Sequence, residues 1–270
     1  MVLYLHHSDY TADYLMVFRP FGLGYFYQKL AVGGFFFLSG YKLTNSKSLD
    51  SIRGFITNRI FRIYFLYLCA IVVFSFTGYP YFNQQLFPSM PNVILHILCL
   101  QAILPNYYGN IYHVFWFISI LFLCYSFFLA TRGIIHKKSF WITLSLILTG
   151  IFIIHQLSNN TVFILDITIY LVFFALGMAF SKNVDRINNL NEISLFITSC
   201  SGLLLLLFFR NRIYTNTWHD NLVLYILVVI STLPLFILFF KIAPKLFLPP
   251  AIIKTMRFIS YSSFCVFLLK

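Results

Sequence analysis

Seven long apolar runs, joined by short connections, constrain this chain more than any other feature of its sequence. They cover residues 21–41, 59–77, 112–130, 140–154, 162–180, 193–209 and 222–240. A helix needs about 20 predominantly apolar residues to cross a bilayer. The chain is 60% hydrophobic and only 10% charged, which leaves too little polar surface to cover a water-soluble globule. The sequence therefore predicts an all-α polytopic membrane protein with a single transmembrane domain over residues 1–270.

One further apolar run, residues 93–104, is too short to cross a membrane. It lies between Pro91 and Pro105, which is typical of a re-entrant or half helix near residues 92–105. The apolar runs at the two ends of the chain, residues 1–8 and 258–270, are also shorter than a crossing helix. We expect both to be parts of longer helices, so that the sequence is truncated at both ends.

The distribution of Lys and Arg predicts which loops face the cytoplasm. If residues 93–104 form a half helix, fourteen Lys and Arg residues fall in one set of alternate loops, and only Arg19, Lys29, Arg210 and Arg212 fall on the other side. Cytoplasmic loops are enriched in these residues, so the first set is predicted to be cytoplasmic. If residues 93–104 crossed fully, this bias would collapse. The net charge of +12 thus indicates membrane orientation and anionic headgroups rather than nucleic acid.

A basic stretch within residues 33–67 is the strongest candidate for binding an anion. Arg59 and Arg62 are three residues apart at the start of an apolar run, so they share one face of a helix. Guanidinium groups match phosphate oxygens, which makes the pair a candidate phosphate site at the membrane boundary. The alternative is that both arginines act only as topology signals. The five cysteines form neither a CxxC motif nor a Cys/His cluster, so we expect no disulfide and no metal site.

Six short segments, in this order along the chain, carry a family resemblance. They are residues 2–7 (VLYLHH), 35–41 (FFFLSGY), 59–64 (RIFRIY), 113–118 (HVFWFI), 177–178 (GM) and 259–261 (ISY). The ordered set resembles the integral membrane acyltransferases of family 3, which O-acetylate cell-surface polysaccharides. Two positions depart from the family pattern: Phe65 stands where a proline is usual, and Leu121 stands where some members carry a glutamate. The resemblance implies a bundle of about ten helices in the full-length form.

The resemblance also implies an acyl donor and the residues that meet it. Acetyl-CoA would bind from the cytoplasmic side with its phosphates near Arg59 and Arg62, and Trp116 would wall the acyl-CoA channel. Tryptophan at a helix start is otherwise an interfacial anchor. His6 and His7 correspond to the end of the family's first helix, which carries its essential histidine. His6 is the better match because it directly follows the apolar run 2–5, and adjacent helix positions point about 100° apart.

A histidine suits acyl transfer because its neutral imidazole is available near pH 7, either as a base or as a nucleophile that carries the acyl group. The alternative is that His6 and His7 are hydrated at the outer boundary. His113 and Asp166, also expected near the outer boundary, are candidates to contact a sugar acceptor, or are simply hydrated. His96 and His155 have no recognisable partner and are predicted to have packing or interface roles.

Ser39 and Gly40 are predicted to allow close helix packing rather than catalysis, because small residues let helix backbones approach. Together these observations predict an O-acetyltransferase of the cell envelope, a multi-pass protein of the bacterial plasma membrane. It would move an acetyl group from cytoplasmic acetyl-CoA to an extracytoplasmic sugar or polysaccharide. The alternatives are a transporter or flippase of a lipid-linked saccharide, which should show broken helices in both halves of the chain, and a non-catalytic membrane scaffold.

Overall fold

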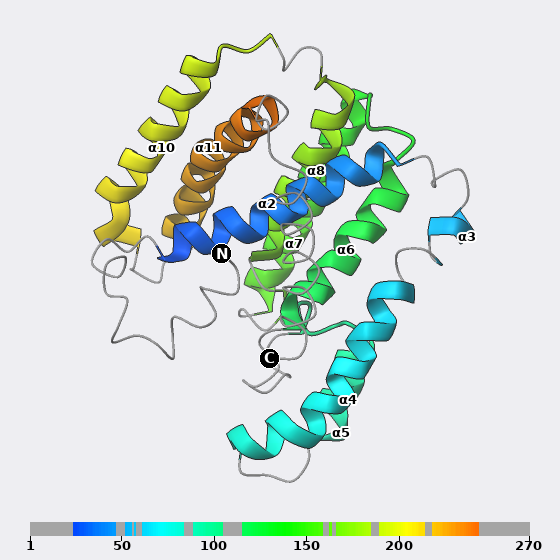
Figure 1. Ribbon diagram of the computed structural model, residues 1–270. Helices are drawn as coiled ribbons and strands as arrows, with labels where there is room; N and C mark the ends of the chain where they lie inside the picture. The colour runs from blue at the N-terminus through cyan, green and yellow to red at the C-terminus, as the bar shows by residue number, and fades with distance from the viewer. Residues whose placement is uncertain are drawn as a thin grey trace, which may run out of the picture. The chain divides into compact units, whose positions relative to one another are not determined.

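The computed structural model describes residues 24–46, 52–55, 57, 61–83, 89–104, 115–158, 162–163, 166–184, 189–213 and 218–242. Every regular element in these ranges is a helix (Figure 1). The predicted all-α class is therefore confirmed for the part of the chain that is described. The short terminal runs, residues 1–8 and 258–270, lie outside it.

The described helices are α2 (Gly24–Thr44), α3 (Ile52–Phe55), α4 (Arg62–Asn83), α5 (Met90–Ile97), α6 (Trp116–Thr131), α7 (Lys138–Leu157), α8 (Asp166–Lys182), α10 (Glu192–Ile213) and α11 (Trp218–Ile242). Seven of the described helices overlap the seven runs that were predicted to cross, with ends that differ by up to six residues, and the short helices α3 and α5 lie outside those runs. Within the described residues, α7 and the stretch Tyr225–Ile242 of α11 are long and apolar enough to cross a membrane. Shorter apolar helical stretches are Ile63–Phe76, Trp116–Thr131 and Glu192–Leu206.

Helix α7 presents apolar side chains outward, as expected when hydrocarbon is the solvent. Among its 20 residues only Phe140, Leu144 and His155 are buried. By contrast, Leu146 and Leu157 are 68% and 80% exposed. A large exposed apolar surface marks contact with another protein or with a membrane. Together with the apolar composition of the chain, this surface fits a lipid-facing helix.

The chain divides into two compact units. The first unit comprises residues 1–42 and 172–249, and therefore holds most of α2, the second part of α8, α10 and α11. The second comprises residues 43–171 and 250–270, and holds α3 to α7 with the first turns of α8. Each unit is described by itself below.

In the first unit, α2 and α8 approach so closely that only glycine fits at two positions. A Cβ added to Gly40 would overlap the carbonyl oxygen of Phe174, and one added to Gly177 would overlap that of Phe37. Glycine permits such backbone contact between membrane helices. The prediction that Gly40 serves helix packing is confirmed, and its partner Gly177 belongs to another of the family-like segments.

Three aromatic rings next to this crossing show how the helices of the first unit are oriented. The rings of Tyr41, Phe180 and Phe240 contact one another, with centroids 5.0 to 5.6 Å apart. A lysine follows within one or two residues of each ring: Lys42, Lys182 and Lys241. These three basic positions therefore lie at the same end of the unit, in agreement with their predicted placement in loops on one side of the membrane.

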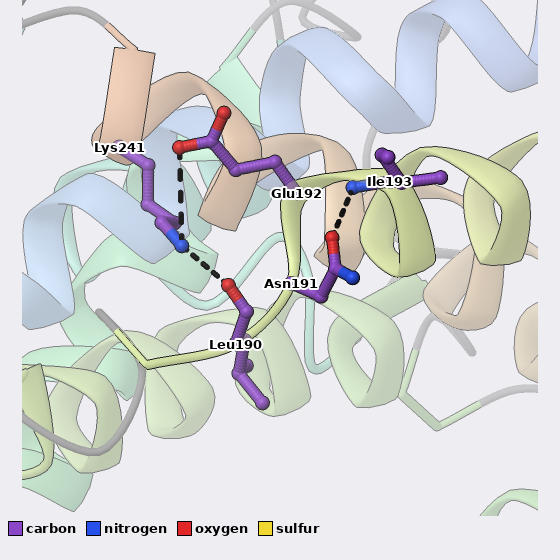
Figure 2. Close-up of polar contacts among 5 residues, drawn as sticks. All are labelled: Leu190, Asn191, Glu192, Ile193 and Lys241. Atoms are coloured by element: carbon purple, nitrogen blue, oxygen red, sulfur yellow. Dashed lines mark hydrogen bonds and ion pairs between the residues drawn. The ribbon is translucent and has the colours of Figure 1, made fainter.

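Lys241 also connects the end of α11 to the start of α10. Its Nζ donates a hydrogen bond to the carbonyl oxygen of Leu190 and lies 4.0 Å from Oε1 of Glu192 (Figure 2). Beside it, the Oδ1 of Asn191 accepts a hydrogen bond from the backbone N–H of Ile193 at 2.9 Å, which caps the start of α10. Helices α10 and α11 therefore form an antiparallel pair (Figure 1).

One basic residue of this unit differs from its predicted placement. The charge count assigned Lys29 to the outer loops, but it lies within α2 and its side chain is fully buried. The physical reason is that α2 extends well before and after Lys29, so the residue is on a packed helix and not on a connection. The charge bias does not depend on this one residue.

In the second unit, contacts at the end of α6 gather the loops that are predicted to be cytoplasmic. Phe55 of α3 packs against Phe128, with ring centroids 5.9 Å apart, and Phe127 packs against Phe140 at the start of α7 at 5.8 Å. The segment before α4 and the basic connection between α6 and α7 therefore lie at the same end of this unit. That connection holds Arg132 and Lys137, and Lys138 begins α7.

Helix α5 is the short helix that the sequence predicted near residues 92–105. It has eight residues, or about 12 Å at 1.5 Å per residue, which is too short to cross a bilayer. The end of α5 lies beside the start of α4, because the hydroxyl of Tyr64 donates to the carbonyl oxygen of Ile97 at 2.7 Å (Figure 1). The chain then turns at Cys99, whose φ is 55°.

After that turn the chain leads away from the basic end of the second unit. The carbonyl oxygen of Ile103 accepts a hydrogen bond from the backbone N–H of Phe163, and the carbonyl of Phe163 is bound by His155 near the end of α7. This end of α7 is opposite to the end that carries Lys138. The charge pattern requires a half helix that enters the membrane domain, turns, and leaves on the side from which it entered. The path of residues 90–104 agrees with this requirement.

The glycine crossing generates a stability prediction. Gly40→Ala adds a methyl group against the backbone of α8, so we expect it to destabilise the fold by about 1–3 kcal/mol, as overpacking commonly does. Gly150→Ala is the matched control, because nothing lies within 4 Å of its added Cβ and alanine favours a helix. The check is thermal denaturation of the detergent-purified protein. Equal stability of the two variants would contradict the close crossing.

The orientation generates a second prediction, tested with a membrane-impermeant maleimide on intact cells. Ser46→Cys and Lys137→Cys should react only after the membrane is permeabilised, whereas Ser158→Cys, after α7, should react in intact cells. The parent chain, with its own five cysteines in apolar segments, is the background control. Reaction of Ser46→Cys or Lys137→Cys in intact cells would show that the charge-based orientation is wrong.

Candidate functional site

The predicted site residues fall into two groups. His6, His7, Arg59 and His113 lie outside the described residues, so their roles stay predictions. The other three each begin a helix: Arg62 begins α4, Trp116 begins α6 and Asp166 begins α8. Helices hold site residues more precisely than loops do, which suits Trp116 and Asp166 as candidates.

The structure brings Trp116 and Asp166 to one region of the second unit through Tyr170. The indole of Trp116 stacks on the ring of Tyr170, with centroids 5.4 Å apart and planes inclined by 25°. Asp166 lies four residues before Tyr170, on the same face of α8. Asp166 is also an acidic residue in the first turn of a helix, where a carboxylate stabilises the helix dipole. A structural role therefore accounts for Asp166 without a substrate.

A buried hydrogen-bond chain that the sequence did not predict holds the start of α6. Gln101 donates from Nε2 to the carbonyl oxygen of Phe115 at 2.7 Å and to the hydroxyl of Tyr67 at 3.0 Å. Tyr67 in turn donates to the carbonyl oxygen of His96 at 2.8 Å. The side chains of Gln101, Tyr67 and His96 are all fully buried. The chain therefore joins α4, the end of α5 and the residue that precedes Trp116.

Ser119 holds the turn after α5 to α6. Its hydroxyl donates to the carbonyl oxygen of Cys99 at 2.6 Å and accepts from the backbone N–H of Ala102 at 3.2 Å. Cys99 has a positive φ, which is uncommon for a residue other than glycine. The serine therefore bonds to two backbone groups of the turn, the carbonyl of Cys99 and the N–H of Ala102, that lie outside a helix.

The two histidines that were predicted to pack do so. His96 is fully buried, and its Nδ1 lies 2.7 Å from the carbonyl oxygen of Asn92. His155 is buried, with its Nδ1 2.9 Å from the carbonyl oxygen of Phe163. A carbonyl oxygen only accepts hydrogen bonds, so Nδ1 carries the proton in both rings. Both histidines fix local backbone conformation.

A cavity of about 300 Å³ opens beside the turn that follows α5. Most of its lining is apolar, and three hydroxyl groups and one thiol contribute the polar part. The lining residues are Tyr64, Ile97, Leu98, Cys99, Leu100, Ile103, Ser119, Phe122, Leu123 and Ser126. Among the described candidates, neither Trp116 nor Asp166 lines this cavity. Among the described residues, no group of three His, Cys, Asp or Glu side chains is placed to hold a metal ion.

The comparisons with known proteins agree with this architecture. Residues 1–269 match the family model Acyl_transf_3, which is described as an acyltransferase domain. No curated protein and no solved structure matches the chain. The family match spans both compact units, all the described helices and every predicted site residue.

Proposed function

This chain belongs to acyltransferase family 3, and we propose that it O-acetylates a sugar or polysaccharide outside the cell, using acetyl-CoA from the cytoplasm as the donor. That it is a membrane acyltransferase follows from the family match and the apolar helices. The match over residues 1–269 is the single observation that carries the proposal. The acetyl group, the donor and the acceptor are the proposed parts.

On the donor side, the proposal is supported by where α4 begins. Arg62 is its first residue, at the edge of an apolar helix and three residues after Arg59. The phosphates of acetyl-CoA would bind these two guanidinium groups, which offer planar sets of N–H donors. The thioester would then extend into the membrane domain, with the indole of Trp116 as part of the wall of its channel.

The chemistry requires one group that handles a proton or carries the acyl group. In direct transfer, His6 or His7 takes the proton of the sugar hydroxyl while the oxygen bonds to the acetyl carbonyl carbon. The carbon–sulfur bond of acetyl-CoA then breaks, and the departing thiolate takes up a proton. In the covalent route, the imidazole first accepts the acetyl group from sulfur and then passes it to the hydroxyl oxygen. Both routes need a neutral imidazole, which histidine supplies near pH 7.

On the acceptor side, we propose that the sugar approaches the end of the domain at which α6 and α8 begin. His113 would lie just before α6, and Asp166 begins α8. An imidazole and a carboxylate are both suited to hydrogen-bond sugar hydroxyls. The stacking of Trp116 on Tyr170 supports this region as the meeting point of donor and acceptor, because it joins the starts of the same two helices.

The test is labelling of surface polysaccharide from radiolabelled acetyl-CoA, in membranes of cells that express the protein. His6→Ala or His7→Ala should lower labelling by about 100-fold or more, as loss of a general base or nucleophile does. Arg59→Ala/Arg62→Ala should raise the KM for acetyl-CoA by at least about tenfold, because charge-assisted phosphate contacts are lost. Membrane insertion is checked for each variant.

A matched control separates phosphate binding from a general loss of charge. Lys137→Ala/Lys138→Ala also removes two cations, from a loop at the same predicted side, and should leave the KM for acetyl-CoA unchanged. If the parent protein does not label glycan, or if labelling survives in all the histidine and arginine variants, the proposed reaction and site are wrong. The saccharide transporter would then be the better hypothesis.

A further inference from the structure

We propose that Gln101 is a positioning residue for the acyl donor, because it fixes the start of α6 and thereby the indole of Trp116. The inference rests on the proposed function, in which Trp116 forms part of the donor channel. The side chain of Gln101 is fully buried in the turn after α5. Its Nε2 reaches two oxygen atoms, that of the Phe115 carbonyl and that of the Tyr67 hydroxyl.

The contact with Phe115 is made at the point that sets the direction of Trp116. Phe115 is the N-cap residue of α6 and directly precedes Trp116. The ring of Phe115 packs between Tyr67, at 5.4 Å, and Phe74, at 5.9 Å, while its carbonyl oxygen is bound by Gln101. The peptide that leads into Trp116 is thus held on two sides. A change in its orientation would turn the indole away from Tyr170.

The orientation of α6, more than the stability of the fold, explains why residue 101 carries an amide. Burying an amide is costly unless its hydrogen bonds are made. The two N–H bonds of Gln101 are made, but no donor among the described residues binds its Oε1, which is also buried. A leucine of similar size would fill the same space without that cost. What a leucine lacks is the pair of directed bonds that tie the turn after α5 to α4 and to α6.

The expected functional effect is on donor binding and not on the chemical step. Net hydrogen-bond contributions of about 1.4 kcal/mol correspond to about a tenfold change in an equilibrium constant. Gln101→Leu should therefore raise the KM for acetyl-CoA by about tenfold and leave kcat within about twofold.

The test measures the fluorescence emission of Trp116, which reports on the surroundings of its indole. Trp141→Phe/Trp218→Phe leaves Trp116 as the one tryptophan of the chain, since the sequence contains three. In this background, purified in detergent, Gln101→Leu should shift the emission maximum of Trp116 and weaken its saturable response to acetyl-CoA. Ser126→Ala is the matched control, because it removes an exposed hydroxyl of the same helix that donates to the carbonyl oxygen of Phe122 in its own helix. It should change neither signal.

A second variant separates positioning from a merely structural role. Tyr67→Phe removes a buried hydroxyl of the same hydrogen-bond chain but leaves the bond from Gln101 to Phe115 in place. It should lower thermal stability without changing the emission of Trp116 or the KM. The proposal is overturned if Gln101→Leu behaves like Ser126→Ala, or if Tyr67→Phe changes emission and KM as much as Gln101→Leu does.

Two further outcomes are also decisive. If Gln101→Leu does not insert, Gln101→Met keeps an unbranched side chain of similar length and removes the N–H donors, and the same readings apply. Failure of both variants to insert would show that residue 101 supports folding and would overturn the positioning role. If acetyl-CoA has no effect on Trp116 in the parent background while Gln101→Leu still shifts its emission, the donor assignment fails but the control of Trp116 by Gln101 stands.

Discussion

Backbone polar groups inside a membrane must be hydrogen-bonded within the protein, and the turn after α5 is where this constraint is hardest to meet. Helices satisfy it by themselves, but residues 98–104 are not helical. Side chains of neighbouring helices supply the missing partners here: Tyr64, Tyr67 and Ser119 all bind backbone groups in or next to the turn. The backbone of α5 and its turn satisfies part of this requirement, and hydroxyl groups of α4 and α6 bind further carbonyl oxygens of the same segment.

The same constraint connects architecture to sidedness. A half helix keeps an odd crossing out of the chain, and fourteen Lys and Arg residues are then predicted to fall on one side. Within the first unit, the contacting rings of Tyr41, Phe180 and Phe240 place three lysines at one end. That ring contact depends on the close approach of α2 and α8, which two glycines permit. Two family-like segments, far apart in sequence, thus share one packing function.

Features that depend on a local sequence pattern were predicted from the sequence. Features that depend on contacts between residues far apart in the chain were not. Run lengths and flanking prolines located the helices and α5, and small size alone identified Gly40 as a packing residue. Gln101 gave no such signal, because its partners Phe115 and Tyr67 lie 14 and 34 residues away and the hydrogen bonds exist only in the folded chain. Lys29 was misplaced for a related reason: a charge count treats every cation as a loop residue, whereas packing can bury one within a helix. The roles of His6, His7, Arg59 and His113 remain predictions, because these residues lie outside the described ranges.

The central claim is that donor and acceptor meet one enzyme from opposite sides of the membrane. The most direct measurement supplies radiolabelled acetyl-CoA to sealed membrane vesicles of known orientation and follows the label into glycan. The account predicts acetylated glycan inside inside-out vesicles, whose outer face is the cytoplasmic one, and no labelling of sealed right-side-out vesicles. Equal labelling in both orientations, or acetylated glycan on the same face as the added acetyl-CoA, would contradict it.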